Sequence, residues 1–179
     1  LIARSMLGMR VLLFEQDNTR FKPILDWPDN ALATTSTHDL PTLNGWWHGR
    51  DIDWNARLDF VDANGEIEWR RHRQRERQGL RDALSQDPQN FREESHEADQ
   101  VVDASVRFLG HTRAPLVLLP LEDALGIDEQ ANLPGTIDSH PNWRRRLARP
   151  SSELLDDEDA ARRLELLACA RQQAFERDR

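Results

Sequence analysis

The chain has 179 residues, the length of one domain, and its apolar content of 38% is enough for a modest hydrophobic core. A net charge of −8 argues against nonspecific nucleic-acid binding, because neutralising phosphates requires a basic surface. No apolar stretch approaches the roughly 20 residues that cross a bilayer, and no signal peptide is visible. The single cysteine, Cys169, can form neither a disulfide framework nor a cysteine-based metal site. We therefore expect a soluble, cytoplasmic protein without nucleic-acid or membrane partners.

Three short apolar segments are typical of buried β-strands, and each ends in a polar or acidic cluster. They span residues 10–14, 31–36 and 115–120. Between the second and third, helical periodicity predicts a charged helix over residues 67–84 and a second helix over residues 98–109. One face of the second helix carries Ala98, Val101, Val102, Ser105 and Leu109.

The charged helix contains an arginine-rich run, Arg70 to Arg81, that by itself would suggest a basic binding surface. Acidic residues alternate with the arginines at spacings that permit pairing between residues i and i+4. The sequence therefore favours a solvated, salt-bridged helix face over a nucleic-acid site.

The last third of the chain has fewer strand signals. Residues 121–125 resemble a short helix, and residues 126–142 are rich in Gly, Pro, Asn and Asp, which predicts an ordered loop. A terminal helix is expected from Asp157 onward, and its apolar stripe would consist of Ala160, Leu164, Leu167, Ala168 and Phe175.

Alternation of strand, polar loop and helix is typical of a parallel α/β fold, in which functional residues follow the carboxyl ends of the strands. Three strands are fewer than half of an eight-stranded barrel. In isolation they would leave open hydrogen-bonding edges. The sequence therefore suggests part of a larger α/β structure.

The polar cluster with the clearest chemical content is residues 37–43, Thr-His-Asp-Leu-Pro-Thr-Leu, directly after the second predicted strand. It places the Asp39 carboxylate beside the His38 imidazole at the carboxyl end of a strand, where both groups could contact a substrate. An aspartate before a helix is also a common helix cap, and the spacing alone does not distinguish the two roles. A second polar loop, which contains Asn132, could share the same end of the sheet or could serve only to set turns.

Other site types find little support. The six histidines form no His-Glu-x-x-His pattern or clustered ligand set, so no metal is expected. No glycine-rich phosphate loop is present, so neither a nucleotide nor another cofactor is implied. Most of the six tryptophans are expected in the core, and Trp46 and Trp47 should begin the helix that packs behind the second strand.

Three motifs occur together in a recognisable order. They are residues 37–43 with Gly45-Trp46-Trp47, Leu121-Glu122-Asp123 with Leu125-Gly126, and residues 132–136 (Asn-Leu-Pro-Gly-Thr) followed by residues 141–145 (Pro-Asn-Trp-Arg-Arg). This order resembles the closing third of amylomaltases, the disproportionating 4-α-glucanotransferases. The similarity covers nearly the whole chain.

The resemblance implies the C-terminal part of a (β/α)8 TIM-like barrel, about its last three strands, over residues 1–150. Residues 151–179 would form a terminal helix packed on it. The reaction implied is a retaining double displacement on α-1,4-glucans and maltooligosaccharides. Asp39 matches the family's transition-state-stabilising aspartate, while His38 and Asn132 match substrate contacts.

The family's nucleophile and acid/base are implied to lie on earlier strands, in the remainder of the catalytic barrel. Glu122 and Asp123 match a separate Leu-Glu-Asp segment and are not assigned acid/base work. Because retaining chemistry needs two carboxyl groups about 5 to 5.5 Å apart, the chain alone is expected to be inactive. Two alternatives are a noncatalytic acidic α/β interaction module and an α-glucan hydrolase of the same barrel superfamily.

Overall fold

The computed structural model describes residues 6–87, 90 and 97–177. It is an α/β structure with a three-stranded parallel sheet in the order β1 (Gly8–Val11), β4 (Ala31–Thr34), β5 (Leu116–Leu118). β4 is central: Gly8 pairs with Ala31 on one side, and Leu32 pairs with Leu116 on the other. The expectation of a parallel α/β fold is therefore confirmed.

The strands are shorter than the sequence suggested, for identifiable reasons. β1 ends at Val11 because its partner β4 ends at Thr34, and residues Leu12–Phe14 form the 3-10 turn η1 instead. β4 stops before Thr35 and Ser36, whose hydroxyls donate to the Asp123 carboxylate. Pro115 and Pro120, at the limits of the third predicted strand, lack the N–H that a strand ladder requires.

Only β4 is the buried strand that the sequence predicted. Its neighbours β1 and β5 each have one paired edge among the described residues, and most of their residues are exposed or half-buried. Leu116 and Leu118 are 43% and 48% exposed. The prediction of burial was wrong for β1 and β5, because the described part of the chain covers them incompletely.

No helix connects β1 to β4, although the two strands are parallel. The connection consists of η1, a hairpin of β2 (Gln16–Asp17) and β3 (Arg20–Phe21), and the 3-10 turn η2 (Ile24–Asp26). Asn18 and Thr19, with φ of 47° and 72°, form the hairpin turn in the conformation that suits two-residue loops. The sequence pattern did not predict this hairpin.

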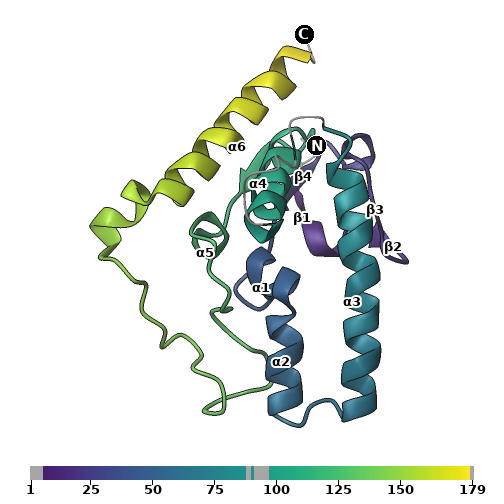
Figure 1. Cartoon of the computed structure of the whole chain (residues 1–179). Coiled ribbons are helices and arrows are strands. Elements are labelled where there is room, and N and C mark those ends of the chain that lie inside the picture. The colour runs from purple at the N-terminus through teal and green to yellow at the C-terminus, as the bar shows by residue number, and fades with distance from the viewer. Residues whose placement is uncertain (1–5, 88–89, 91–96, 178–179) are drawn as a thin grey trace.

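Four helices follow β4: α1 (Leu43–His48), α2 (Arg50–Arg57), α3 (Ala63–Leu84) and α4 (Glu97–Gly110). Thr42 caps α1 and Asp62 caps α3 through side-chain oxygens that accept backbone N–H groups, so α3 begins four residues before the predicted start. α2 and α3 run side by side, joined by a short turn (Figure 1). α2 was not predicted.

The core lies where α1, α3 and α4 meet the sheet. The predicted apolar face of α4 is confirmed, since Ala98, Val101, Val102, Ser105 and Leu109 are all buried, and Trp46 and Trp47 lie in α1 as expected. Of the six tryptophans, Trp27, Trp46, Trp47 and Trp54 are buried. The other main core side chains are Leu12, Phe21, Leu43, Leu80, Leu84 and Phe108.

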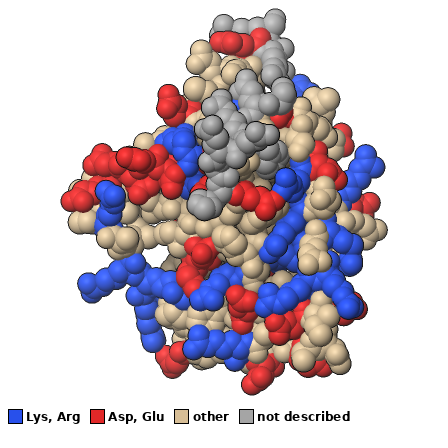
Figure 2. Space-filling view, viewed as in Figure 1, with Lys and Arg blue, Asp and Glu red and all other residues tan. Residues whose placement is uncertain are grey.

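One arginine departs from the expected solvated face of α3. The Arg73 side chain is only 4% exposed, pairs bidentately with Asp51 on α2 at 2.7 and 2.9 Å, and donates to the Trp46 carbonyl at 2.6 Å. Arg70 follows the expected pattern, because it pairs with Glu66 and Asp53 at the surface. Figure 2 shows basic and acidic side chains interspersed over this face of the molecule.

The C-terminal third contains α5 (Leu121–Ala124), the 3-10 turn η3 (Ser151–Asp156) and α6 (Glu158–Arg177). The short helix and the terminal helix are confirmed, and residues 126–142 form no helix or strand, as expected of an ordered loop. α6 packs on α4 and its far end projects from the rest of the molecule (Figure 1).

The predicted apolar stripe of α6 was largely wrong. Ala160, Arg163 and Ala170 are buried, whereas Leu164, Ala168 and Phe175 are exposed. The reason is close packing, since a Cβ on Gly110 of α4 would lie 2.5 Å from the Ala170 Cβ, so small residues make this contact. No helix among the described residues is long and apolar enough to span a membrane.

Candidate functional site

The loop after β4 is held by one buried carboxylate. Asp123 on α5 is fully buried and accepts hydrogen bonds from the hydroxyls of Thr35 and Ser36 and from the backbone N–H of Leu43. The Ser36 bond measures 2.9 Å and the Leu43 bond 2.7 Å. Residues 37–42 are thus fixed at both ends by the same side chain.

The protonation of Asp123 reflects two opposing effects. Burial raises the pKa of its carboxyl above the ordinary value, and the hydrogen bonds from Thr35, Leu43 and Ser36 oppose that rise. Because all three partners can donate to it, the group is suited to organising the loop. Without exposed surface, it cannot touch a substrate.

Between these fixed ends, Asp39 and His38 are presented to solvent. Their side chains are 50% and 61% exposed, and the His38 Nε2 lies 3.3 Å from the Asp39 Oδ2. The Asn132 amide donates to the other oxygen, Asp39 Oδ1, at 2.6 Å, and the Asn132 backbone N–H donates to the His38 carbonyl at 3.1 Å. The structure therefore brings the three predicted site residues into one cluster beyond the carboxyl end of β4.

The loop that carries Asn132 is itself rigidly tied. The Asn142 side chain accepts from the Leu133 N–H at 2.9 Å and from His140 Nδ1 at 2.5 Å, and donates to the Thr136 carbonyl at 3.0 Å. Trp143 follows in the same loop. It is 66% exposed, and its ring centroid lies 5.3 Å from that of the His38 ring. The sequence pattern gave no signal that Trp143 would adjoin His38.

Glu129 anchors the same loop to α2. Its carboxylate accepts from the Trp54 indole N–H at 2.9 Å and from Arg50 Nε at 2.6 Å, and Arg145 lies 3.0 Å away. Burial alone would raise the pKa of Glu129, but these hydrogen bonds and the nearby arginines outweigh it, so the pKa is below its ordinary value.

A cavity of about 360 Å³ adjoins Asp39, and we call it the α3 cavity. Its walls come from segments directly after β1 and β4 and from α2 and α3, so it lies at the carboxyl end of the sheet. This is where functional sites of parallel α/β folds are found. The lining includes Phe14, Gln16, Asp39, Pro41, Asn55, Trp69, His72, Arg73, Glu76, Gln130 and Pro134.

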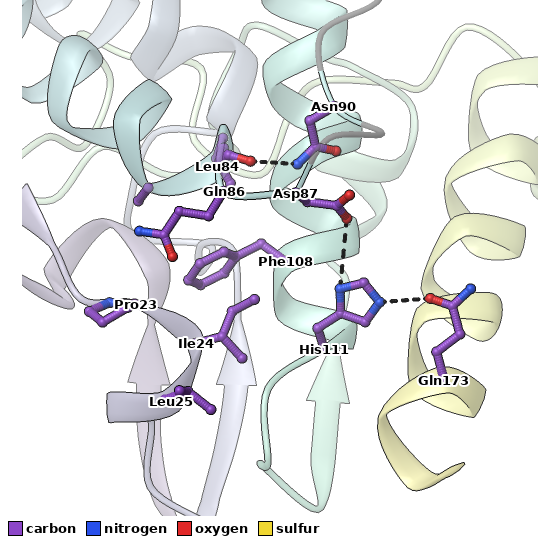
Figure 3. Close-up of a pocket in the computed structure, with 11 residues that line it drawn as sticks. Pro23, Ile24, Leu25, Leu84, Gln86, Asp87, Asn90, Phe108, His111 and Gln173 are labelled. Carbon is purple, nitrogen blue, oxygen red and sulfur yellow. Dashed lines mark hydrogen bonds and ion pairs between the residues drawn. The ribbon is translucent and has the colours of Figure 1, made fainter. Parts of the chain in front are cut away.

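A second cavity of about 380 Å³ lies between η2, the end of α3, α4 and α6. Phe108 and Ile24 line it, and His111 bridges Asp87 and Gln173 at one side (Figure 3). Residues before β4 and before β5 form its walls, so it lies at the amino end of the sheet. It contains none of the predicted site residues, and the α3 cavity is the better candidate.

Within the described residues, no group of three or more His, Cys, Asp or Glu side chains is arranged to hold a metal ion. The site therefore consists of a carboxylate, an imidazole and an amide, with aromatic rings nearby. Such groups can donate to and accept from the hydroxyls of a neutral, hydroxyl-rich ligand.

Fold and site together define an α/β protein whose polar side chains follow the central strand of a parallel sheet. The chain belongs to the glycoside hydrolase 77 family, described as 4-alpha-glucanotransferase, because the sequence model of that family matches residues 1–152. The resemblance of the three motifs to this family is thereby confirmed.

Relatives agree with this assignment. The chain is 33% identical over 158 residues to a 4-alpha-glucanotransferase of Haemophilus influenzae, covering 83% of this chain and 22% of that protein. It is 31% identical over 183 residues to one of Mycobacterium tuberculosis, covering 94% of this chain and 24% of that protein. The chain thus spans about a quarter of the length of these relatives.

Solved structures show the same fold. Amylomaltase from Corynebacterium glutamicum matches with a TM-score of 0.75 at 22% identity, over 90% of this chain and 25% of that one. Amylomaltase from Streptococcus agalactiae, solved in complex with acarbose, matches with a TM-score of 0.59 at 18% identity, over 93% of this chain and 27% of that one. The chain shares its fold with a segment of these enzymes.

Proposed function

We propose that the chain is the C-terminal part of a cytoplasmic 4-α-glucanotransferase that transfers α-1,4-glucan segments between maltooligosaccharides. The observation that carries the proposal is the exposed Asp39 carboxylate, held between His38 and Asn132 at the carboxyl end of β4 in a chain of this family. Residues 1–150 would contribute the last strands of a (β/α)8 barrel, and residues 151–179 a helix packed on it.

Asp39 acts in this proposal as the third carboxylate of a retaining mechanism. In the transition state the sugar ring flattens and acquires positive charge, and hydrogen bonds from the ring hydroxyls to a fixed carboxylate strengthen as this happens. The contact with the Asn132 amide supports the role, because it orients one oxygen of Asp39 and leaves the carboxylate half exposed. His38 would bind a hydroxyl of the same sugar, and Asn132 would contact the substrate near the acceptor side.

The nucleophile and the acid/base would come from the remainder of the barrel. A single stabilising carboxylate replaces neither, so the isolated chain is expected to be inactive. Among the described residues the outer edges of β1 and β5 pair with no strand, which supports the same view, since further strands could pair there.

The test starts from the coding sequence upstream of Leu1, which should encode an aspartate at one strand end and Glu-Asp-Leu-Gly at another. The full-length protein should convert maltotriose into glucose and longer chains. Accumulation of glucose and maltose alone would instead indicate a hydrolase. A start codon directly upstream, with neither motif, would support the noncatalytic interaction module.

Asp39→Asn in the full-length enzyme should lower kcat by at least about 100-fold with the thermal midpoint unchanged, because the lost charge acts on the transition state. A matched control is Asp29→Asn, the same substitution at an exposed position before the amino end of β4. Equal activity of the two variants would refute the role of Asp39.

A further inference from the structure

The α3 cavity extends well beyond Asp39. It runs from the loop of residues 37–42, which we call the Asp39 loop, across α2 and α3, as far as Trp69, His72 and Glu76. Its volume of about 360 Å³ falls in the range of small-molecule sites. A ligand bound at Asp39 could therefore extend into this cavity.

The charges of the lining select the class of ligand. Among the described residues, its lining includes three acidic residues, Asp39, Asp51 and Glu76, and one arginine, Arg73, which is already paired with Asp51 and Glu76. An anionic ligand such as a phosphate ester would be repelled. Asn55 and Gln16 add amide groups and His72 adds an imidazole, which suits the hydroxyls of an uncharged polyol.

Trp69 supplies an aromatic side chain in the cavity wall. It is half-buried on α3 and, among the described residues, makes no ring contact or hydrogen bond. The faces of a pyranose ring are built of C–H groups, and its hydroxyls point outward. A flat indole can therefore cover one face while the hydroxyls keep their hydrogen bonds. Trp69 is suited to stacking on a sugar ring.

Gln16 provides an unpaired acceptor in the same wall. Its amide nitrogen donates to the Leu13 carbonyl at 2.9 Å and to Glu76 Oε1 at 3.0 Å, which fixes the orientation of the amide. Its oxygen, Oε1, is buried and has no hydrogen-bond partner in the part of the chain that the structure describes. Buried acceptors of this kind are rarely left unsatisfied, and a hydroxyl entering from the cavity would satisfy it after a small adjustment of the wall.

We propose that the α3 cavity is a glucan subsite, in which Trp69 stacks on a glucose ring adjacent to the one held at Asp39 and Gln16 accepts from one of its hydroxyls. This inference rests on the proposed function, because it takes the ligand to be an α-1,4-glucan. It adds binding contributions from Trp69 on α3 and Gln16 on β2.

The test uses the full-length enzyme and three substitutions of one residue. Trp69→Ala should raise the KM for maltooligosaccharides roughly five- to tenfold while kcat stays within about twofold, because the stacking acts equally on the ground and transition states. Trp69→Phe should restore most of the affinity. Trp69→Leu, which keeps apolar bulk without a flat ring, should bind as poorly as Trp69→Ala. Phe60→Ala, an exposed aromatic outside the cavity, serves as control.

The outcomes separate the two proposals. If Asp39→Asn lowers kcat while every Trp69 variant keeps the wild-type KM, the proposed function stands and the subsite falls. If Trp69→Leu retains affinity like Trp69→Phe, the role of Trp69 is packing and the subsite is again refuted. If the wild-type enzyme neither binds nor transfers glucans, the proposed function fails and the subsite fails with it.

Discussion

At the scale of single residues, Asp123 shows how a side chain outside the site can determine the site's geometry. It accepts hydrogen bonds from two hydroxyls before the loop of residues 37–42 and from one backbone N–H after it. The sequence analysis placed Asp123 in a family motif but gave it no role. Its burial and its partners, 80 to 88 positions away in the chain, could be known only from the fold.

Asp123→Ala should destabilise the protein by about 3 kcal/mol, since three donors would lose their buried acceptor. It should also lower kcat, because the loop that positions Asp39 would no longer be fixed. Urea denaturation and maltotriose kinetics measure the two effects. Ser36→Ala, which removes one of the three donors, should cost about 1 kcal/mol. A stable Asp123→Ala enzyme with normal kcat would contradict this account.

Glu129 gives a pH-dependent prediction at the same scale. Its folded-state pKa lies below the ordinary value of 4.5, so its contribution to stability is complete above that value and is lost as pH falls through the folded-state pKa. Glu129→Gln should lower stability by about 1–2 kcal/mol at pH 7. The difference from wild type should shrink toward pH 4. Thermal midpoints of both proteins at each pH would measure it, and a difference independent of pH would disprove the assignment.

At the scale of elements, α6 is attached through an unusual contact for a terminal helix. Arg163 is fully buried and donates to the Ala124 carbonyl at 3.0 Å and to Asp103 at 2.9 Å, while Asp99 lies 3.2 Å away. It thereby connects α6 to α4 and to α5, the helix that carries Asp123. The pattern of apolar residues along α6 could not predict this attachment, because Arg163, which makes the contacts, is charged.

Arg163→Met should detach α6, at a cost of about 3 kcal/mol, because Asp99 and the Ala124 carbonyl lose their cation and Asp103 keeps only Arg162. Limited proteolysis should then cleave between η3 and α6. Arg162→Met serves as control, since Arg162 is a more exposed neighbour that pairs with Asp103 and Asp159. Equal protease resistance of wild type and Arg163→Met would rule out the anchoring role.

At the scale of the whole molecule, the two outer strands of the sheet expose apolar residues, and each has one edge that no other described strand pairs with. Met9 on β1 and Leu116 and Leu118 on β5 are among the exposed large hydrophobic residues. Exposed apolar strand edges favour pairing with other chains. In the proposed enzyme, neighbouring strands of the barrel would cover them.

The isolated 179-residue chain should therefore self-associate, which sedimentation velocity would detect as species larger than 20.8 kDa. Leu116→Lys, which places a charge on the exposed strand, should reduce the association. A monomer with a sharp, cooperative thermal transition would contradict the prediction.

Local patterns in the sequence were enough to predict the parallel α/β class, the helices α1, α3 and α4 after the second strand, and the motif with His38 and Asp39. These features depend on periodicity and on residues that are neighbours in the chain. The sequence did not determine the hairpin between β1 and β4, the burial of Arg73 and Arg163, or the role of Asp123. The hairpin is a local element that the strand and helix patterns missed. The buried arginines and Asp123 depend on contacts between distant segments, and only the tertiary structure decides which polar groups are removed from water together.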